Sequence, residues 1–336
     1  MLNVTWFVLA SMLFTGYFFL EGFDYGVGML LPIISRTDRE RRLVLSTIGP
    51  FWDGNEVWLI AAGGTLLAAF PAWYASFLSS FYLAFFLLLV GLIVRGVGIE
   101  FRSRIDDGKW RRLWDSLFVT GSVIPPLIWG FVMANMVKGV PFDAHGNFVG
   151  PWLKLVNVYS IVGAVTVALV FALHGALFLM IRTRGALHDR AEKLAFRIGP
   201  VTTGIFVVFV AITYYQADIV RRLGLDPGPI PVFALLSLIA IRLFLHNKQE
   251  KWAFAATGLT IIFATVTIFL SLYPNVMISS INPRWNLTIF NAAANPYSLH
   301  VMTITAVCIL PIVLGYQAWS YWVFRKRIDE RSPLEY

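Results

Sequence analysis

Long apolar runs separated by short polar gaps dominate the chain. The runs are roughly 20 residues long, which is the length that an α-helix needs to cross the hydrocarbon core of a bilayer. They lie at about residues 6–34, 52–70, 76–99, 114–137, 155–181, 199–217, 230–246, 253–272 and 299–324. The pattern predicts an all-α integral membrane protein with nine transmembrane helices in a single membrane domain, residues 1–336.

The composition excludes a soluble protein. Of the 336 residues, 58% are hydrophobic and 14% are charged, whereas charged residues make up about a quarter of an average globular chain. The N-terminal run has neither the basic start nor the small-residue cleavage site of a secretory signal peptide. We therefore expect it to be retained as the first span.

The positions of the basic residues predict how the helices are oriented. The net charge is +8, but Lys and Arg occupy the gaps between spans rather than one surface that could bind nucleic acid. Of the 27 basic residues, 21 lie in every second gap, at 36–42, 102–112, 182–197, 242–251 and 325–331. Five lie in the gaps between these, which contain few Lys or Arg residues, and Arg95 lies inside a span. Basic loops stay on the cytoplasmic side. The N-terminus is therefore expected outside and the C-terminus in the cytoplasm.

A short motif recurs after 150 residues. Ile48-Gly49-Pro50 with Gly54 reappears as Ile198-Gly199-Pro200 with Gly204. The same offset superposes the first four spans on the next four. This predicts two similar four-helix units followed by one extra helix, with a chance match of four residues as the alternative.

Ionisable residues lie within or at the ends of the first three spans. They are Glu21, Asp24, Asp53, Glu56, Arg95 and Glu100. A charge inside a bilayer is costly, so such residues usually face the interior of a bundle or a water path. Residues three apart share a helix face, which pairs the two acids of span 1 and, separately, the first two acids of span 2. We expect the two pairs to converge near the cytoplasmic side, with Glu21 nearer the middle.

Two acid pairs in a bundle interior allow two interpretations. In a low dielectric a pair would not readily carry two charges, so at least one carboxyl is expected to exchange a proton near neutral pH while Arg95 keeps the remainder ionised. Proton conduction is the first interpretation. The second is a buried ion network, with Asp53 capping its helix, that only locks the helices together.

Cysteine and histidine are too few for the usual metal and haem sites. Cys308 is the single cysteine, which excludes an intrachain disulfide and a cluster held by several thiolates. His174 is the one histidine well inside a span, whereas haem ligation needs suitably placed axial ligands. We expect His174 to be a hydrogen-bonded packing residue, and we expect no haem or metal ligands in this chain.

Several specific motifs are spread from about residue 20 to residue 302. The first is Gly22-Phe23-Asp24-Tyr25-Gly26-Val27-Gly28, whose glycines also form a small-residue face for close helix contact. The second is Trp52-Asp53-Gly54-Asn55-Glu56-Val57-Trp58. Further motifs are Arg39-Glu40-Arg41-Arg42, Gly63-Gly64, Pro125-Pro126 and Tyr273-Pro274-Asn275-Val276. Together they resemble subunit II of the bacterial cytochrome bd-type (cyanide-insensitive) quinol oxidase family.

The resemblance implies a subunit of a respiratory enzyme in the bacterial cytoplasmic membrane. Such oxidases pass electrons from quinol to dioxygen, form water, take protons from the cytoplasm and release the quinol protons outside. In the family, two b-type haems, one d-type haem and the quinol site belong to subunit I, which has a similar fold. This chain would be its haem-free partner. A small single-helix accessory subunit and a structural quinone or lipid are further partners that the resemblance allows.

The resemblance also assigns roles to individual residues. Asp53 matches the family position proposed as the entrance of the cytoplasmic proton channel, and Asp24 matches the acid of the first span. Glu21 and Glu56 complete the expected proton pathway, although the family can have aspartate at the first position and glutamine at the second. The supporting residues are Trp52, Arg95, Glu100 and Asn55.

Two other functions are compatible with the residues alone. A secondary transporter also carries intramembrane acids and internal repeats, but transporters commonly break helices at a midplane site in both halves, and matching Gly-rich breaks are missing here. A purely structural assembly subunit would use the acids only to lock helices. Replacing Asp53 by Asn would separate conduction from locking.

Overall fold

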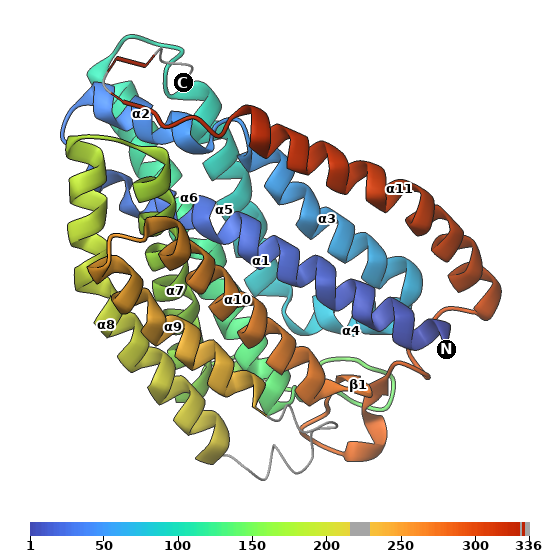
Figure 1. Ribbon diagram of the computed structural model, residues 1–336. Helices are drawn as coiled ribbons and strands as arrows, with labels where there is room; N and C mark the ends of the chain where they lie inside the picture. Colours follow the sequence, from blue (N-terminus) through green and yellow to red (C-terminus); the bar gives the residue numbers. More distant parts are fainter. Residues whose placement is uncertain (216–228, 330, 333–336) are drawn as a thin grey trace.

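The computed structural model describes residues 1–215, 229–329 and 331–332, and it is mainly helical (Figure 1). The helices are α1 (Leu2–Ile34), α2 (Asp38–Ile48), α3 (Trp52–Ala69), α4 (Pro71–Ser80), α5 (Tyr82–Phe101), α6 (Gly108–Lys138), α7 (Val158–Arg182), α8 (Ala186–Tyr215), α9 (Ile230–His246), α10 (Glu250–Leu272) and α11 (Pro296–Val323). The other elements are two 3-10 turns, Trp152–Leu155 and Pro283–Trp285, and the strands β1 (Asn275–Met277) and β2 (Leu287–Thr288).

The predicted all-α fold is confirmed, and every predicted apolar run overlaps a helix. Among the described residues, seven helices are long and apolar enough to cross a membrane: α1, α5, α6, α7, α8, α10 and α11. α9 is apolar but has 17 residues, and α3 opens with the polar segment 52–56, which lowers its hydropathy. The end of the predicted run 199–217, together with Arg221 and Arg222, lies outside the described residues.

Two predicted helix boundaries are wrong. The run 76–99 is not one helix, because α4 ends at Ser80 and α5 begins at Tyr82, with the buried ring of Phe81 between them. α8 begins at Ala186 instead of residue 199, because the polar segment before the apolar run is also helical. Hydropathy reports which residues are apolar. It detects neither a break within an apolar run nor a helix that continues into water.

Helix α2 lies in what the hydropathy pattern marks as a gap, and it begins with a local signal. The Thr37 side chain accepts a hydrogen bond from the Glu40 N–H, and the Glu40 carboxylate accepts one from the Thr37 N–H, which together form a capping box. After α2, Gly49-Pro50 separates it from α3, whereas Gly199-Pro200 lies inside the continuous helix α8. The repeated motif thus occupies a helix break in one half and a helix interior in the other.

Helices α1 and α7 cross at the centre of the bundle with a glycine on each side. A methyl group on Gly26 would lie 2.7 Å from the Cα of Gly175, so only glycine permits this approach. α1 also packs against α3, α6 and α10. Residues 21–28 of α1 are consequently all buried, and this segment is where the sequence places its acids.

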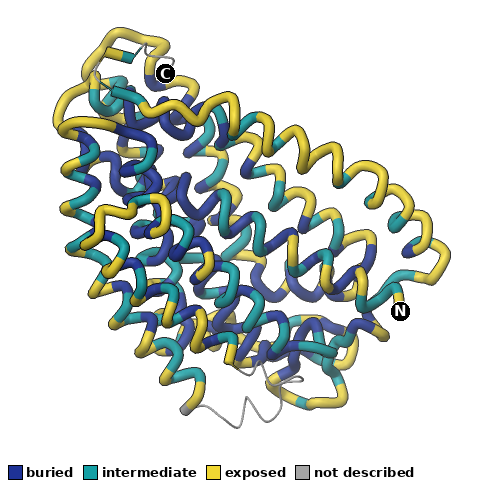
Figure 2. Tube along the Cα trace, viewed as in Figure 1, coloured by how far each residue is buried: buried dark blue, intermediate teal, exposed yellow. Residues whose placement is uncertain are grey.

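Helix α11 is little covered by the rest of the chain (Figure 2). Leu299 is the one buried residue of its 28. Its N-terminal part is attached through Trp6, whose indole N–H donates to the Leu299 carbonyl (3.2 Å) and to the Thr303 hydroxyl (3.0 Å). A cleft of about 610 Å³ separates α11 from α1 and α3. α11 therefore lies along the rim of the bundle.

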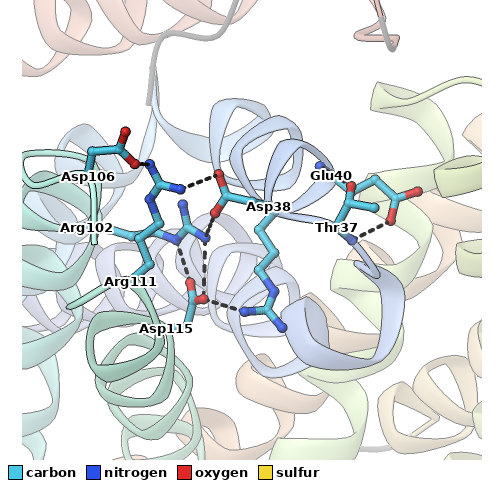
Figure 3. A network of polar contacts seen from close by, with 8 residues as sticks. Thr37, Asp38, Glu40, Arg102, Asp106, Arg111 and Asp115 are labelled. Atoms are coloured by element: carbon cyan, nitrogen blue, oxygen red, sulfur yellow. Dashed lines mark hydrogen bonds and ion pairs between the residues drawn. The ribbon is translucent and has the colours of Figure 1, made fainter. Parts of the chain in front are cut away.

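The gaps rich in Lys and Arg gather at one end of the bundle, where α2 and the segment that follows α11 also lie (Figure 1). We call this the basic end, and Figure 3 shows how α2 is held there. Arg102 contacts Asp38 of α2 at 2.7 Å and Asp115 of α6 at 2.5 Å. Arg41 of α2 contacts the same Asp115 at 2.6 Å. These ion pairs fasten α2 across the ends of α5 and α6.

The opposite end is covered by a short hairpin and the loop that follows α6. β1 and β2 pair in antiparallel fashion, with Asn275 opposite Thr288. Val140 forms a parallel bridge with Ser279, and the Asn3 side chain donates to the Ile289 carbonyl at 2.8 Å. The N-terminus is thereby tied to this end.

Candidate functional site

Glu21 and Asp24 lie about one turn apart on α1, within its completely buried segment. Neither side chain is exposed. A buried carboxylate is costly unless it is paired and hydrogen-bonded. The partners of these two acids therefore define what the site can do.

Arg95 of α5 is the partner of two carboxylates. Its Nη1 forms an ion pair with Glu21 Oε1, both side chains being inaccessible to solvent. The same nitrogen contacts Glu56 Oε1 of α3 at 2.8 Å. The guanidinium also lies over the ring of Tyr25, with its Cζ 4.8 Å from the ring centroid. One cation thus joins α1, α3 and α5.

Asp24 has a neutral partner. Asn55 Nδ2 of α3 donates to Asp24 Oδ2 at 2.6 Å. The carbonyl oxygen of Asn55 accepts hydrogen bonds from Gln317 Nε2 (3.0 Å) and from the Tyr321 hydroxyl (2.8 Å). Both of these residues belong to α11. The rim helix therefore reaches the buried acid through a single amide.

Several buried polar atoms of this cluster have no hydrogen-bonding partner among the described residues. They are Glu21 Oε2, Asp24 Oδ1, Arg95 Nε and Arg95 Nη2. Buried polar groups are almost always satisfied by protein or by water. These two acceptors and two donors mark where the buried cluster has unused hydrogen-bonding capacity.

A line of hydrogen-bonded aromatic side chains continues from Arg95 toward the opposite end. The Tyr25 and Tyr17 hydroxyls are 2.6 Å apart, and the Trp129 indole N–H donates to the Tyr17 hydroxyl at 3.2 Å. All three side chains are buried. Polar contacts thus extend along α1 beyond the charged residues.

Asp53 does not join the buried cluster, which contradicts the expected convergence of both acid pairs. Asp53 is exposed in the first turn of α3, whereas Glu56, one turn further along, is partly buried and reaches Arg95. The helix period explains the difference, since one turn carries the side chain about 5 Å further along the helix axis. The two acids therefore form a step from the surface into the bundle.

The other supporting residues take different positions. Glu100 is exposed near the end of α5, where its carboxylate lies 4.0 Å from Arg104. Trp52 is half-buried, and its ring would lie 3.2 Å from a methyl group on Gly96. Trp52 thus packs α3 against α5 next to Arg95, while Glu100 faces away from the cluster.

His174 of α7 is buried and hydrogen-bonded, as expected. Its Nε2 is 3.2 Å from the Phe19 carbonyl, and its Nδ1 is 2.6 Å from the Thr257 hydroxyl. A carbonyl can only accept, so His174 Nε2 donates to Phe19. The Thr257 hydroxyl that contacts Nδ1 also donates to the Phe254 carbonyl at 2.8 Å. Its ring is stacked on Phe254 with centroids 4.5 Å apart.

The residues present do not fit a haem or metal site around His174. Both ring nitrogens are used by protein groups, so neither is free to ligate a metal ion. Within the described part of the chain, no group of three His, Cys, Asp or Glu residues is arranged to hold a metal ion.

Sequence reasoning missed five residues of the cluster: Gln317, Tyr321, Tyr25, Tyr17 and Trp129. Tyr321 follows Gln317 by four positions, and this spacing places both on one face of α11. That spacing was the available signal. Nothing in the local sequence, however, indicates which helix this face meets.

Fold and site together define a multi-pass helical membrane protein with an ionisable cluster buried among its first helices. The chain belongs to the family of cytochrome bd terminal oxidase subunit II, whose model matches residues 2–324. The resemblance carried by the motifs is thereby confirmed.

Full-length relatives support this assignment. Cytochrome bd ubiquinol oxidase subunit 2 of Bacillus subtilis (strain 168) is 42% identical over 335 residues, covering 100% of this chain and 99% of the relative. Cytochrome bd-I ubiquinol oxidase subunit 2 of Escherichia coli (strain K12) is 34% identical over 365 residues, covering 98% of this chain and 96% of the relative. The chain is a subunit of a cytochrome bd quinol oxidase, an oxidoreductase complex, and a multi-pass protein of the bacterial cytoplasmic membrane.

A solved structure shows the same fold. A chain of the bd oxidase from Geobacillus thermodenitrificans superposes with a TM-score of 0.80 at 17% sequence identity, covering 96% of this chain and 98% of that chain. The overall arrangement of helices is therefore shared at low sequence identity.

Proposed function

We propose that this chain is the haem-free subunit of the oxidase, that it docks on the haem-carrying subunit I, and that it supplies a proton path from the cytoplasm toward the oxygen-reducing haem. Nine helices would cross the membrane, with the N-terminus outside and the C-terminus in the cytoplasm. A small accessory subunit and a bound quinone or lipid are compatible with this role.

The basic end supports the proposed orientation. Residues from three basic gaps meet around α2, where Arg41 and Arg102 share Asp115 and Arg190 pairs with Glu40. Basic loops are retained in the cytoplasm. The exposed Asp53 begins α3 immediately after α2 and its junction, so it would face cytoplasmic water.

The observation that carries the proposal is Arg95 shared between Glu21 and Glu56. One cation balances only one of these two carboxylates. In a low-dielectric interior the remaining negative charge is costly, so a shared proton is favoured and can be exchanged. Asp53 would accept protons at the surface, Glu56 and Glu21 would hold them beside Arg95, and Asp24 would form the neighbouring buried site.

The haem-free assignment is supported by His174, whose two ring nitrogens both contact protein groups. The haems of the partner subunit would supply the electron transfer to dioxygen. This chain would bind and move protons. Docking is supported by α3, which buries few of its own residues and so leaves its outer face available to a partner.

The path is tested by Asp24→Asn and Asp53→Asn in the purified two-subunit enzyme. Asp24→Asn should slow oxygen reduction and coupled proton uptake by about tenfold or more, since a positioned proton-transfer group commonly contributes at least that factor. Asp53→Asn should have a smaller effect, because water can partly replace an exposed carboxylate. Haem content should stay unchanged, and copurification of subunit I tests docking.

Glu100→Gln is the matched control, because it removes an exposed acid from the same end of the bundle without touching the cluster. It should leave proton uptake unchanged. If Asp24→Asn and Asp53→Asn also leave uptake unchanged with normal haem content, the acids only lock helices and the proton role is wrong.

A further inference from the structure

Gln317 and Tyr321 are the polar connection between the exposed helix α11 and the buried acid cluster. α11 is covered mainly near its ends, yet these two side chains, one turn apart, reach Asn55 in the core. Asn55 itself is fully buried. An otherwise apolar, peripheral helix thus has two hydrogen-bond donors directed at one buried amide.

The position of Tyr321 is set by packing on both sides of the helix end. Its ring is stacked on Phe51, with centroids 4.3 Å apart and planes 1° from parallel. Phe51 immediately precedes α3, and the Arg182 guanidinium lies 5.5 Å from its ring centroid. Arg182 also donates to the Lys326 carbonyl at 2.8 Å, just beyond α11. The end of α11 is therefore anchored independently of the acid cluster.

The two hydrogen bonds match one orientation of the Asn55 amide. Its carbonyl accepts from both Gln317 and Tyr321, and its NH2 group faces Asp24 Oδ2. An NH2 group can only donate, so it stabilises an unprotonated carboxylate oxygen. With the amide reversed, the carbonyl would face Asp24 and would suit only a protonated carboxyl.

The surroundings strengthen this preference. The cleft beside Gln317 is lined mainly by apolar side chains from α1, α3 and α11. Hydrogen bonds are stronger in such a low-dielectric environment. Reversal of the Asn55 amide would require the Gln317 amide and the Tyr321 hydroxyl to turn with it, so that both accept instead of donate.

We propose that Gln317 and Tyr321 are positioning residues for the proton step at Asp24: they fix the Asn55 amide so that its NH2 group faces the carboxyl. This inference rests on the proposed function, in which Asp24 binds a proton in transit. It adds α11, from the far end of the sequence, to the machinery of the first three spans.

The test uses Tyr321→Phe, Gln317→Leu and the double variant in the purified two-subunit enzyme. Tyr321→Phe keeps the ring stacked on Phe51 and removes one donor. Each single change should slow coupled proton uptake about fivefold, the effect of losing one hydrogen bond. Each should also shift the infrared carboxyl band that disappears in Asp24→Asn. In an Asp24→Asn background the same changes should add nothing further.

Tyr316→Phe is the matched control, because this neighbouring tyrosine of α11 is largely exposed and packs on Trp319. It should change neither uptake nor the band. Haem content reports folding, and Gln317→Leu alone decides the question if Tyr321→Phe lowers haem content.

Two results would overturn the inference: an Asp24 band unmoved in the variants, or equal slowing with and without Asp24. The proton role fails separately, if Asp24→Asn itself leaves uptake unchanged. In that case the infrared band still shows whether α11 positions the carboxyl.

Discussion

Helices α1 and α7 place different chemistry at two buried positions that lie 150 residues apart. Asp24 and His174 are separated by the 150-residue offset of the repeated motif, and both are completely buried. Asp24 lies next to an arginine-linked pair of acids and is hydrogen-bonded to an amide. His174 is bonded to a hydroxyl and a carbonyl and is stacked on an aromatic ring.

The comparison separates a buried site that holds charge from one that only satisfies polar groups. In the His174 region each ring nitrogen has a hydrogen-bonding partner within the protein. In the Asp24 region four polar atoms have no partner among the described residues, and two carboxylates share one cation. The buried ionisable residue of α7 is thus satisfied by its neighbours, whereas that of α1 lies beside a cation shared by two acids.

The largest expected effect is at Arg95. Arg95→Leu would leave Glu21 and Glu56 buried without a cation, and breaking a buried ion pair typically costs about 3–5 kcal/mol. We expect a sharply lower unfolding temperature and poor recovery of the assembled enzyme. Adding Glu21→Gln and Glu56→Gln to Arg95→Leu should restore much of the stability.

Arg41→Leu provides the control for this prediction. Arg41 also pairs with a carboxylate, but its side chain is 30% exposed, and exposed ion pairs contribute about 0–1 kcal/mol. Equal destabilisation by the two changes would contradict the importance of burial. Thermal unfolding of the purified complex measures both.

An intermediate effect is expected in the His174 region. Thr257→Val keeps the shape of the side chain but leaves His174 Nδ1 without its hydrogen-bonding partner, which costs about 1–3 kcal/mol for a buried group. The rate of oxygen reduction per assembled enzyme should stay unchanged. Thr265→Val on the same helix is the control, because that hydroxyl donates to the Ile261 carbonyl one turn back. A rate loss with Thr257→Val as large as with Asp24→Asn would remove the distinction between the regions.

The smallest effect is the pH dependence of the ion pairs around α2. Burial alone would raise the pKa of Asp38, but the hydrogen bond and charge of Arg102, with the charge of Arg111, outweigh it and lower that pKa. A hydrogen bond from Arg190 lowers the pKa of Glu40. Lowered values in the folded state mean that these acids stabilise the fold above their usual pKa of about 4. This stabilisation is lost as the pH falls through the lowered values.

The unfolding temperature measured from about pH 6 to pH 3 checks this expectation. Asp38→Asn should flatten the acid side of the profile and cost less than about 1 kcal/mol at neutral pH, as expected for a partly exposed pair. An unchanged profile in Asp38→Asn would show that other acids control the acid sensitivity.

Much of the fold was predictable because the bilayer imposes length and polarity on each helix. The run 230–246 coincides with α9, and α1, α7 and α10 differ from prediction by four residues or fewer at each end. The errors occur where hydropathy gives no information about whether a helix breaks or continues. The break at Phe81 lies within apolar sequence, and the polar beginning of α8 lies outside it.

The acid cluster was predictable only in part. The cost of a charge in a span singles out Glu21, Asp24 and Arg95, and the structure brings all three into one region. The sequence could not show that Asp53 stays exposed while Glu56 reaches Arg95, because that depends on where α3 emerges from the bundle. Helix spacing pairs neighbouring acids, but it does not choose their partners on other helices.

The sequence by itself determined that this is a membrane protein, which residues carry charge within or next to its spans and which family it belongs to. These properties follow from composition, local spacing and specific motifs, which do not depend on how distant segments meet. Only the tertiary structure decided that α11 reaches Asn55 through Gln317 and Tyr321, since a contact across more than 260 positions is set by helix packing. The positions of the charged residues follow from the local sequence, whereas the residues that they contact depend on how the helices pack.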